Sequence, residues 1–319
     1  MKMLITGGMG FIGAALTRHL VEAGHTVRIF DDVSRGDPHR LADLADRIDY
    51  IRGDIRNPQE VLEATSGCQM VWHLAAVNGT KNFYAVPDTV IDVGIGGTLN
   101  VLQAAFAHQL QRLVFVSSSE VYGDAQQIPT PETHPLVIAD PTNPRFSYAG
   151  SKIAGELLCL HMGPARGLET VIVRPHNIYG PDMGGDHVIP QLIEKMMTAA
   201  SESDADDVSI PIEGTGKETR AFCYIDDCVR GLALAGMEGE AGTIYHLGTE
   251  DEVTIDQLNE LLAGALELKL KTIPSERRTG SPIRRCPSTQ KLRTLGYKPQ
   301  VPLAEGLAKT IAWHKKRHQ

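Results

Sequence analysis

The chain has 319 residues and a mass of 34.7 kDa, which is enough for one large α/β unit or two modest domains and excludes a peptide or a lone binding module. Hydrophobic residues make up 42% and charged residues 22%, a composition that excludes a disordered or fibrous protein. Lys and Arg number 31 against 39 Asp and Glu, and this formal charge of −8 argues against a nucleic-acid binder.

The cysteines and the N-terminal residues favour a cytoplasmic protein. The five cysteines are odd in number and scattered without CxxC pairs, so they predict neither a disulfide framework nor a metal site. The first residues, MKMLITGG, lack the apolar region of a signal peptide. We find no run near the roughly 20 apolar residues that a membrane-spanning helix needs, and therefore expect no membrane segment.

Short apolar runs alternate with amphipathic stretches through the first half of the chain. The strand-like runs are 3–6, 27–30, 50–53, 70–75, 113–118 and 170–175, and the helical stretches are 11–23, 39–46, 58–65, 96–107 and 148–163. Such alternation is typical of βα units on a parallel sheet. The sequence therefore predicts an α/β fold with a doubly wound, Rossmann-type parallel sheet.

The alternation breaks down after residue 176, where Gly- and Pro-rich turns follow at 180–186. We therefore expect a dinucleotide-type domain over residues 1–176 and a smaller substrate-binding domain over 177–319. Residues 222–247 again show a helix-then-strand pattern, which indicates that they return to the first domain.

A glycine turn joins the first predicted strand to the first predicted helix. Gly7, Gly10 and Gly13 are spaced as GxxGxxG, and Gly8 gives the alternative GxGxxG. Glycine is required where such a turn is tight and where the backbone approaches a pyrophosphate at a helix N-terminus. The strand–turn–helix context predicts a dinucleotide-binding loop.

An acidic residue follows at the end of the next predicted strand. Asp31 lies near the roughly 20-residue offset expected for a carboxylate that accepts hydrogen bonds from the adenosine ribose and repels a 2′-phosphate. The sequence therefore favours NAD over NADP. Arg35 weakens this preference, because an arginine there could bind a 2′-phosphate, although it could equally be a surface residue.

The second motif is Tyr148-Ala-Gly-Ser-Lys152. An i, i+4 pair shares one helix face, so the Lys152 ammonium can stabilise a Tyr148 phenolate, and a positive nicotinamide would act in the same direction. Ser117, Ser118 and Ser119 follow an apolar strand, at the sheet edge where open α/β sheets bind ligands. Together these residues form a candidate catalytic set.

The chain contains an ordered set of motifs that covers nearly its whole length: TGGMGFIG, FDDVSRGD, RGDI, HLAA, SSSEVYG, SYAGSK, RPHNIYGP, TRAFCYIDD and RRCPSTQKLRTLGY. In this set the chain resembles the extended short-chain dehydrogenase/reductase family, in particular the NAD-dependent nucleotide-sugar epimerases and dehydratases. The resemblance implies a Rossmann fold, NAD and keto-sugar chemistry. It also implies a homodimer formed through helices near 96–107 and 148–163, although their apolar faces would equally suit an intramolecular core.

The resemblance assigns roles to individual positions. The catalytic residues it implies are Ser118, Tyr148 and Lys152, with Glu120 as an additional candidate. The implied cofactor site consists of Gly7, Gly10, Phe11, Ile12, Gly13, Asp31, Asp32, Ser34, Arg35, Asp54, Ile55, Leu74, Ala75, Ala76, Ser117, Tyr148 and Lys152. The implied substrate site consists of Ser118, Ser119, His176, Asn177, Arg220, Arg284 and Arg285.

Two positions depart from the family pattern. Gly94 stands where the family often has an asparagine, so that residue's role must be met in another way. His176 replaces an aromatic or apolar residue, and a sugar contact and a structural role are both open for it. The nucleotide and the sugar depend on loops at 78–84, 183–192 and 208–222, whose geometry the sequence does not give.

Glu120 bears on the choice of reaction. Glucose-type dehydratases carry Asp-Glu after the catalytic Thr, whereas this chain has Ser118-Ser119-Glu120, which is more similar to mannose-type dehydratases and glucuronate decarboxylases. A carboxylate there could act as a base or simply bond to the neighbouring backbone. We predict a nucleotide-sugar epimerase that acts at C4 through a 4-keto intermediate, with a 4,6-dehydratase or a decarboxylase as the alternative. A dinucleotide-binding protein without catalysis and a ketone or aldehyde reductase are weaker alternatives.

Overall fold

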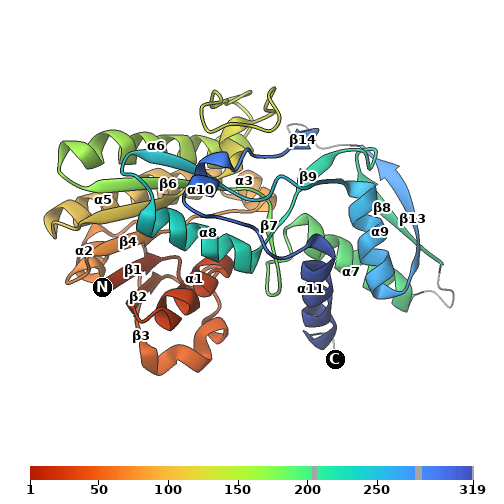
Figure 1. Cartoon of the computed structure of the whole chain (residues 1–319), viewed down its shortest axis with the longest axis horizontal. Helices are drawn as coiled ribbons and strands as arrows, with labels where there is room; N and C mark the ends of the chain where they lie inside the picture. Colours follow the sequence, from red (N-terminus) through yellow and green to blue (C-terminus); the bar gives the residue numbers. More distant parts are fainter. Residues whose placement is uncertain (203–206, 277–281, 318–319) are drawn as a thin grey trace.

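A seven-stranded parallel sheet forms the centre of the larger part of the molecule, at the left of Figure 1. The computed structural model describes residues 1–202, 207–276 and 282–317. The strands of this sheet are β1 (Lys2–Thr6), β2 (Thr26–Asp31), β3 (Ile48–Arg52), β4 (Met70–His73), β5 (Arg112–Val116), β6 (Glu169–Pro175) and β11 (Thr243–Leu247). They lie in the order β11–β6–β5–β4–β1–β2–β3. The strand order reverses between β1 and β4, as in a Rossmann fold, so the predicted fold class is confirmed.

Side chains alternate across each strand and fill two cores, one on each face of the sheet. On β1, Met3 and Ile5 enter one core and Leu4 enters the other. The first core includes α1 (Phe11–Glu22) and α8 (Ile225–Glu238). The second includes α2 (Pro58–Thr65), α5 (Thr98–Ala107) and α6 (Phe146–Ala165). Both faces of the sheet are therefore covered by helices, as a parallel sheet requires.

The stretch 225–247 lies with the sheet although it follows the first segment of the smaller part in sequence. Helix α8 packs against α1, and strand β11 pairs with β6 from Thr243↔Val171 to Leu247↔Pro175. The chain therefore leaves the sheet after β6 and returns to it at β11. It passes between the two parts more than once.

Two elements differ from the sequence-based predictions. Residues 39–46, predicted as a helix, form a kinked 3₁₀ segment, η1 (Pro38–Arg47), in which Leu41 departs from helical geometry. Residues Pro87–Ala107 form one helical stretch that is long and apolar enough, by length and composition, to cross a membrane, which corrects our reading of that segment. Of its most apolar window 44% is buried, and it packs on α2 and α6, as a core helix of a soluble protein also does.

The smaller part, at the right of Figure 1, is built from short strands and helices. Its sheets contain two or three strands each, paired as β12–β9–β14 and β13–β8. The elements are α7 (Val188–Ser201), β8 (Asp207–Glu213), β9 (Thr219–Ala221), β12 (Glu252–Thr254), α9 (Ile255–Leu266), β13 (Lys269–Ser275), β14 (Arg284–Arg285) and α11 (Leu303–Arg317). Helix α10 (Gln290–Thr294) lies with the larger part, where it contacts β11.

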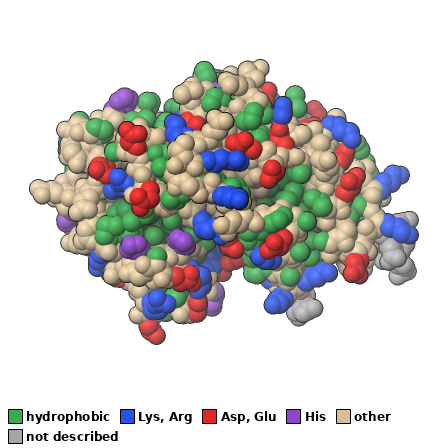
Figure 2. Space-filling model, viewed as in Figure 1, with side chains coloured by type: hydrophobic (Ala, Val, Ile, Leu, Met, Phe, Trp, Pro, Cys, Tyr) green, Lys and Arg blue, Asp and Glu red, His purple; other side chains and the backbone are tan. Residues whose placement is uncertain are grey.

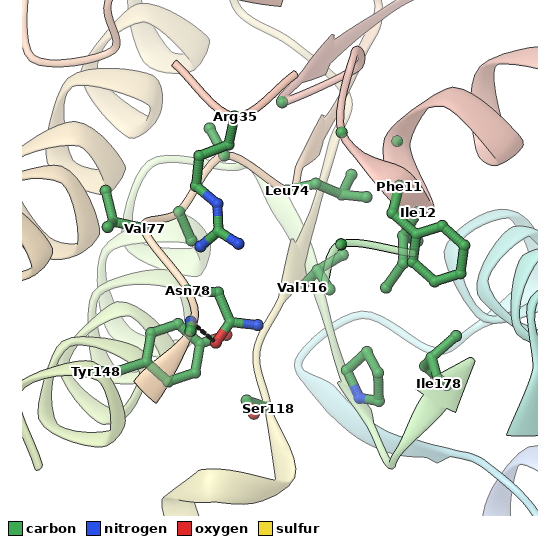
Figure 3. Close-up of a pocket in the computed structure, with 18 of the residues that line it drawn as sticks. Phe11, Ile12, Arg35, Leu74, Val77, Asn78, Val116, Ser118, Tyr148 and Ile178 are labelled. Carbon is green, nitrogen blue, oxygen red and sulfur yellow. Dashed lines mark hydrogen bonds between the residues drawn. The ribbon is translucent and has the colours of Figure 1, made fainter. Parts of the chain in front are cut away.

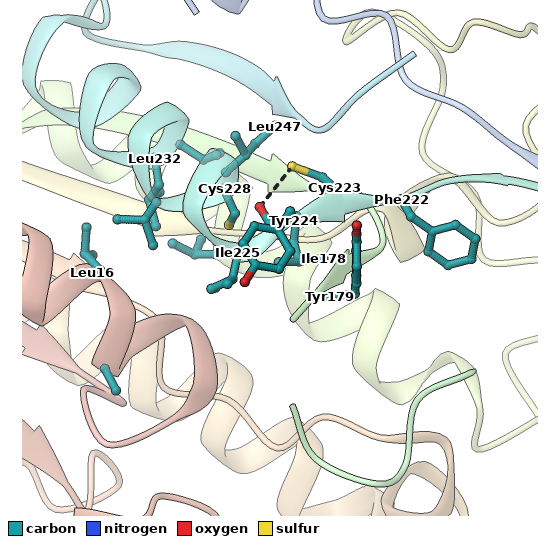
Figure 4. Packing of buried hydrophobic residues seen from close by; sticks show 14 of the residues in the cluster. Leu16, Ile178, Tyr179, Phe222, Cys223, Tyr224, Ile225, Cys228, Leu232 and Leu247 are labelled. Atoms are coloured by element: carbon teal, nitrogen blue, oxygen red, sulfur yellow. Dashed lines mark hydrogen bonds between the residues drawn. The ribbon is translucent and has the colours of Figure 1, made fainter. Parts of the chain in front are cut away.

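Aromatic residues pack where the two parts meet (Figure 4). They come from the parallel pair β7 (Ile178–Tyr179) and β10 (Cys223–Tyr224). The Tyr179 ring lies edge-on to Phe222 and Tyr224, with ring centroids 6.3 and 5.6 Å away. Because these side chains are buried in the same core as α8, the two parts share one hydrophobic core.

On the face shown in Figure 2, charged groups are spread rather than gathered. Acidic and basic side chains are interspersed over both parts of the molecule in this view (Figure 2). This face therefore carries no large patch of a single charge.

Candidate active site

A cleft of about 440 Å³ opens at the carboxyl ends of the parallel strands, between the sheet and the smaller part (Figure 3). Residues after β1, β2, β4, β5 and β6 line it together with residues of α7 and β14. This is the edge at which open α/β sheets bind ligands, next to the point where the strand order reverses. The cleft brings the predicted cofactor loop and the predicted catalytic residues into one site.

The glycine loop leaves room only for backbone. A Cβ on Gly13 would lie 2.1 Å from the Gly7 carbonyl oxygen, and a Cβ on Gly7, where φ is 71°, would lie 2.8 Å from the Ala75 nitrogen. Gly10 caps α1 without any side-chain hydrogen bond, and the first turn of α1 has no acidic residue. The N–H groups of Phe11 and Ile12 therefore remain available at the positive end of the helix dipole, which fits a dinucleotide pyrophosphate.

Asp31 lines the cleft at the end of β2 and is 7% exposed. Its carboxylate accepts hydrogen bonds from the Met9 and Val33 nitrogens at 2.9 and 2.8 Å, so it also holds the glycine loop in place. Burial raises its pKa above the usual value, an effect that these two hydrogen bonds oppose. Each oxygen keeps further acceptor capacity for ribose hydroxyls. Its neighbour Asp32 accepts from the Ser34 nitrogen and hydroxyl.

Arg35 lines the cleft, which argues against the surface alternative left open from the sequence. Figure 3 shows its guanidinium inside the cleft, on the side of Asn78 and Tyr148. The group lies 4.0 Å from the Asp186 carboxylate of the smaller part. Arg35 is therefore neither an ordinary surface residue nor confined to the ribose end of the site.

The other predicted cofactor residues also line the cleft. Ile55 packs against Gly97, where a Cβ would lie 2.4 Å from its side chain. The Asp54 carboxylate is held by Arg56 at 2.6 Å. The Leu74 and Ala75 nitrogens bond to the Thr6 carbonyl and hydroxyl, which fixes the path of the chain beside the glycine loop. The remaining lining residues of this group are Ala76, Phe11 and Ile12.

Ser118, Tyr148 and Lys152 lie together on the opposite side of the cleft. Tyr148 is 7% exposed, and its ring stacks on Phe83 at a centroid distance of 5.0 Å. The Ser118 hydroxyl lies near the phenol and favours its ionised form. The Lys152 ammonium lies 5.8 Å from the Tyr148 ring centroid and donates to the Val116 carbonyl at 2.7 Å.

Burial shifts the pKa values of both Tyr148 and Lys152. Burial raises the pKa of the Tyr148 phenol above its usual value, and the nearby Ser118 hydroxyl opposes this effect. Burial lowers the pKa of Lys152 to about 8. Because the ammonium is directed to the Val116 carbonyl, the protein's own groups keep the phenol protonated, and its ionisation at neutral pH requires further positive charge in the cleft.

The structure accounts for Gly94, one of the two departures from the family pattern. Gly94 lies in a π-helical turn, η2 (Asp92–Gly97), that packs on α6. A Cβ there would lie 2.5 Å from the Ser151 hydroxyl, which itself donates to the Tyr148 carbonyl. A larger side chain at residue 94 therefore cannot fit beside the catalytic helix unless Ser151 moves.

Glu120 faces two arginines at the substrate end of the cleft. Its carboxylate accepts from Arg285 at 2.6 Å and lies 3.9 Å from Arg145. Burial by itself raises the pKa of Glu120, but the attraction and hydrogen bond of Arg285, with Arg145, outweigh burial and lower it. Glu120 is therefore held as a carboxylate, and Arg285 rather than Arg284 faces the cleft.

Three predicted substrate residues, Arg220, Arg284 and His176, lie outside the lining of the cleft, and their role in substrate binding stays a prediction. Arg284 pairs with Glu252 and has a side chain that is 54% exposed. Arg220 donates to the carbonyls of Thr219, Pro282 and Ile283. His176 is 1% exposed, and its ring packs on His246 at 4.7 Å, so the structure favours the structural alternative for it.

Asn177 and the serines remain at the site. Asn177 has a φ of 43° and donates to the Ala221 carbonyl, which places it on the cleft wall. The Ser118 hydroxyl accepts from the Glu120 nitrogen at 3.2 Å and caps the short helix η3 (Ser119–Tyr122). Ser117 also borders the cleft, but its hydroxyl donates to Glu156 at 2.5 Å and is therefore turned into the core.

Several lining residues were not predicted individually from the sequence. Asn78 projects into the cleft beside Tyr148 in Figure 3. It comes from the 78–84 loop, one of the loops on which the sequence predicts that substrate choice depends. Asp186 and His187 come from another such loop. Arg145 also lines the cleft and could have been predicted from the sequence. It lies three residues before Tyr148, a spacing that puts both residues on nearly the same face of a helix.

The family model for the NAD dependent epimerase/dehydratase family matches residues 3–248. The chain therefore belongs to this family of NAD-dependent nucleotide-sugar enzymes. It is 31% identical to a dTDP-glucose 4,6-dehydratase of Streptomyces niveus, over 99% of this chain and 93% of that protein. It is 32% identical to a UDP-N-acetyl-alpha-D-glucosaminuronate decarboxylase of Bacillus cytotoxicus, over 98% of each. It is 30% identical to a UDP-glucose 4-epimerase of Mycolicibacterium smegmatis, over the full length of both.

Solved structures give the same result. A dTDP-glucose 4,6-dehydratase of Streptomyces venezuelae with NAD bound has a TM-score of 0.88 at 30% identity, covering 100% of this chain and 98% of that one. A UDP-glucose 4-epimerase of Thermotoga maritima has a TM-score of 0.89 at 27% identity, covering 100% of both chains. The predicted family and cofactor are confirmed, whereas the relatives include dehydratases, epimerases and decarboxylases at similar identity.

Proposed function

We propose that this protein is an NAD-dependent epimerase that inverts C4 of a nucleoside diphosphate sugar through a bound 4-keto intermediate. The observation that carries the proposal is the placement of Ser118, Tyr148 and Lys152 across one cleft from the glycine loop, with Glu120 neutralised by Arg285. The placement of the three catalytic residues opposite the glycine loop supports oxidation at a sugar hydroxyl. The ion pair of Glu120 with Arg285 argues against a free carboxylate base for elimination.

The residues of the glycine loop and Asp31 would hold NAD, which supplies the hydride acceptor when bound. Tyr148 removes the proton of the C4 hydroxyl, and Ser118, which lines the cleft beside the phenol, orients that hydroxyl. Lys152 contributes positive charge beside the phenol. Asn78 and Phe83 line the cleft and would limit where the sugar ring can lie. Return of the hydride from the reduced cofactor to the opposite face of the 4-keto sugar would then invert C4.

Arg285 and Arg145 support recognition of a negatively charged substrate. Their side chains are 13% and 10% exposed and share the single carboxylate of Glu120, which leaves one positive charge in excess. Charge-assisted hydrogen bonds from arginine suit a diphosphate, and a reductase of small ketones or aldehydes has no need of them. The same argument disfavours a dinucleotide-binding protein without a substrate.

A dehydratase or a decarboxylase is the second candidate function, and Glu120 favours it. The carboxylate lines the cleft close to Ser118 and Tyr148, where C5 of a substrate could lie. If substrate binding draws Arg285 away from Glu120, the pKa of the carboxyl rises and Glu120 becomes a stronger base. The relatives named above include both activities.

The experiment is mass spectrometry and proton NMR on the purified protein with NAD and a panel of UDP-, dTDP-, GDP- and CDP-sugars that includes a uronic acid. We expect one substrate to keep its mass and to show a new anomeric signal. Loss of water or of carbon dioxide would assign the second candidate function instead. NAD binding without conversion of any sugar nucleotide would reject both.

We also propose that the protein is a cytoplasmic homodimer that uses the outward faces of α5 and α6. Leu157 on α6 is 51% exposed although the opposite face of that helix is buried in the sheet core. An exposed leucine on a long helix suits a four-helix contact with a second copy. Light scattering on the wild type and Leu157→Glu tests this proposal, and a wild-type monomer at micromolar concentration would reject it.

A further inference from the structure

A buried chain of polar groups runs behind the cleft and is not used by the mechanism above. Glu156 on α6 and Arg174 on β6 form an ion pair in which each side chain is 2% exposed. The Glu156 carboxylate accepts from Arg174 Nε at 2.8 Å and Nη2 at 2.5 Å. Such a two-point contact fixes the guanidinium in orientation as well as in position.

This ion pair holds the loop that carries Ser118 from both sides. Glu156 accepts from the Ser117 hydroxyl at 2.5 Å, immediately before Ser118. Arg174 donates to the Tyr122 hydroxyl, four residues after Ser118. Because Glu156 lies two helical turns after Tyr148 on the same face of α6, the ion pair connects the Ser118 loop to the helix that carries the proposed base.

The hydrogen bonds continue from Tyr122 toward the substrate end. The Tyr122 hydroxyl lies 2.5 Å from His246 Nε2, and His246 Nδ1 lies 3.0 Å from the Ser288 carbonyl oxygen. Arg174 can only donate and a carbonyl can only accept, so the direction of every bond is set. Tyr122 donates to Nε2, and Nδ1–H donates to Ser288. Tyr122 and His246 are buried, and His246 is neutral because burial and Arg174 lower its pKa to about 3.

The last hydrogen bond of this series, from His246 to Ser288, reaches the segment that carries Arg285. Ser288 lies three residues after Arg285, and its nitrogen donates to the Thr130 carbonyl. Arg285 in turn bonds to Glu120, which directly follows Ser119 in the Ser118 loop. The Ser118 loop and the Arg285 segment are therefore joined through the cleft by one ion pair and through the core by the hydrogen-bonded chain.

We propose that Tyr122 and His246 are positioning residues that hold Ser118 and Arg285 in fixed relation to one another. The inference rests on the proposed function for its kinetic test. Tyr122→Phe removes one hydroxyl, leaves His246 Nε2 buried without its donor, and frees the Ser118 loop from Arg174. Because small displacements of reacting groups reduce rates steeply, we expect kcat to fall about 10- to 100-fold with NAD affinity unchanged.

The test compares Tyr122→Phe, His246→Asn and the double variant with Tyr245→Phe. His246→Asn keeps a donor for the Ser288 carbonyl but loses the bond to Tyr122, so the two single variants should have the same effect and the double variant should add little. Tyr245→Phe is the matched control. The Tyr245 hydroxyl is also buried and accepts from the Glu240 nitrogen at 2.9 Å, but it is not part of the hydrogen-bonded series from Arg174 to Ser288. It should lower thermal stability without changing kcat or KM.

Hydrogen–deuterium exchange of the protein without sugar gives a second readout that does not depend on activity. We expect faster exchange in residues 117–123 and 284–289 of Tyr122→Phe, and wild-type exchange there in Tyr245→Phe. The proposal is overturned if Tyr122→Phe differs from Tyr245→Phe in neither kcat nor exchange, or if the two single variants are additive. If the wild type converts no sugar nucleotide, the proposed function fails and exchange alone decides the positioning role.

Discussion

The two ends of the cleft are built in different ways. At the cofactor end the ligand would meet backbone: the N–H groups at the start of α1 and a glycine loop in which a Cβ on Gly13 would lie 2.1 Å from a carbonyl oxygen. At the substrate end it would meet charged side chains, namely Glu120, Arg145 and Arg285, which come from three separate segments. The comparison shows why NAD is common to the family while the substrate varies, since side chains change more readily than a backbone turn.

The largest effect that we predict lies where the two ends meet. Tyr148→Phe removes the phenol that takes the sugar proton, so kcat should fall about 10³-fold. NAD should still bind, because the pyrophosphate and ribose contacts lie elsewhere in the cleft. Turnover assays and the NAD content of the purified variant measure both effects. Tyr84→Phe, at a tyrosine that is 50% exposed, should leave both unchanged. Near wild-type turnover in Tyr148→Phe would contradict the mechanism.

A second prediction concerns a substitution that disrupts only the cofactor end of the cleft. Gly13→Ala forces the loop backbone to move, because its Cβ meets the Gly7 carbonyl, so NAD affinity should fall about 100-fold, or ~2.7 kcal/mol. Isothermal titration with NAD measures the loss. Gly264→Ala is the control, since a Cβ at that helical position meets no atom within 4 Å outside its own turn and should leave NAD affinity at the wild-type value. Unchanged affinity in Gly13→Ala would reject our account of the loop.

A third prediction concerns a substitution that disrupts only the substrate end of the cleft. Arg285→Gln should raise KM for the sugar nucleotide about tenfold, or ~1.4 kcal/mol, without weakening NAD binding. It should also raise the pKa of Glu120, because Arg285 is the main group that opposes the effect of burial. The equivalent change at Arg284, which pairs with Glu252 outside the cleft, should alter KM less than twofold. If Arg284→Gln has the larger effect on KM, our assignment of the two arginines is reversed.

The smallest predicted effect concerns the pH dependence at the centre of the cleft. Burial lowers the pKa of Lys152 to about 8, so its ammonium is present below that pH and is lost as the pH rises through it. The value of kcat/KM should therefore fall by about half near pH 8 and about tenfold by pH 9. In Lys152→Met the descending limb should be absent and the rate low throughout. A wild-type profile that stays flat from pH 7 to 10 would show that the ammonium is not required.

Local sequence patterns predicted the larger part of the fold and the cofactor end well. The βα alternation, the glycine spacing and Asp31 are each features of a few adjacent residues, and steric limits on the backbone translate them directly into strands, helices and a turn. The YxxxK spacing placed Tyr148 and Lys152 on one face of α6 for the same reason. The kinked η1 segment was missed because its departure at Leu41 has no local signature.

The substrate end was predicted less well, because its contacts join residues far apart in the sequence. Arg284 and Arg285 are neighbours with identical side chains, and only the pairing of β14 with β9 sends one to Glu252 and the other to Glu120. Arg35 was assigned from its distance to Asp31, but the position of Asp186 determines where its guanidinium lies. The Lys152 ammonium also donates to the Val116 carbonyl of a neighbouring strand, a contact between distant residues that the YxxxK spacing does not predict.

The sequence by itself determined the α/β architecture, the dinucleotide loop and the residue types of the catalytic set, because each depends on spacing along a single strand, turn or helix. Tertiary structure alone decided which charges face the cleft, which of two arginines meets Glu120, and how Tyr122 and His246 connect the two sides of the site. These depend on pairings more than 100 residues apart, where the energy of a contact is set by burial and geometry that no local pattern encodes.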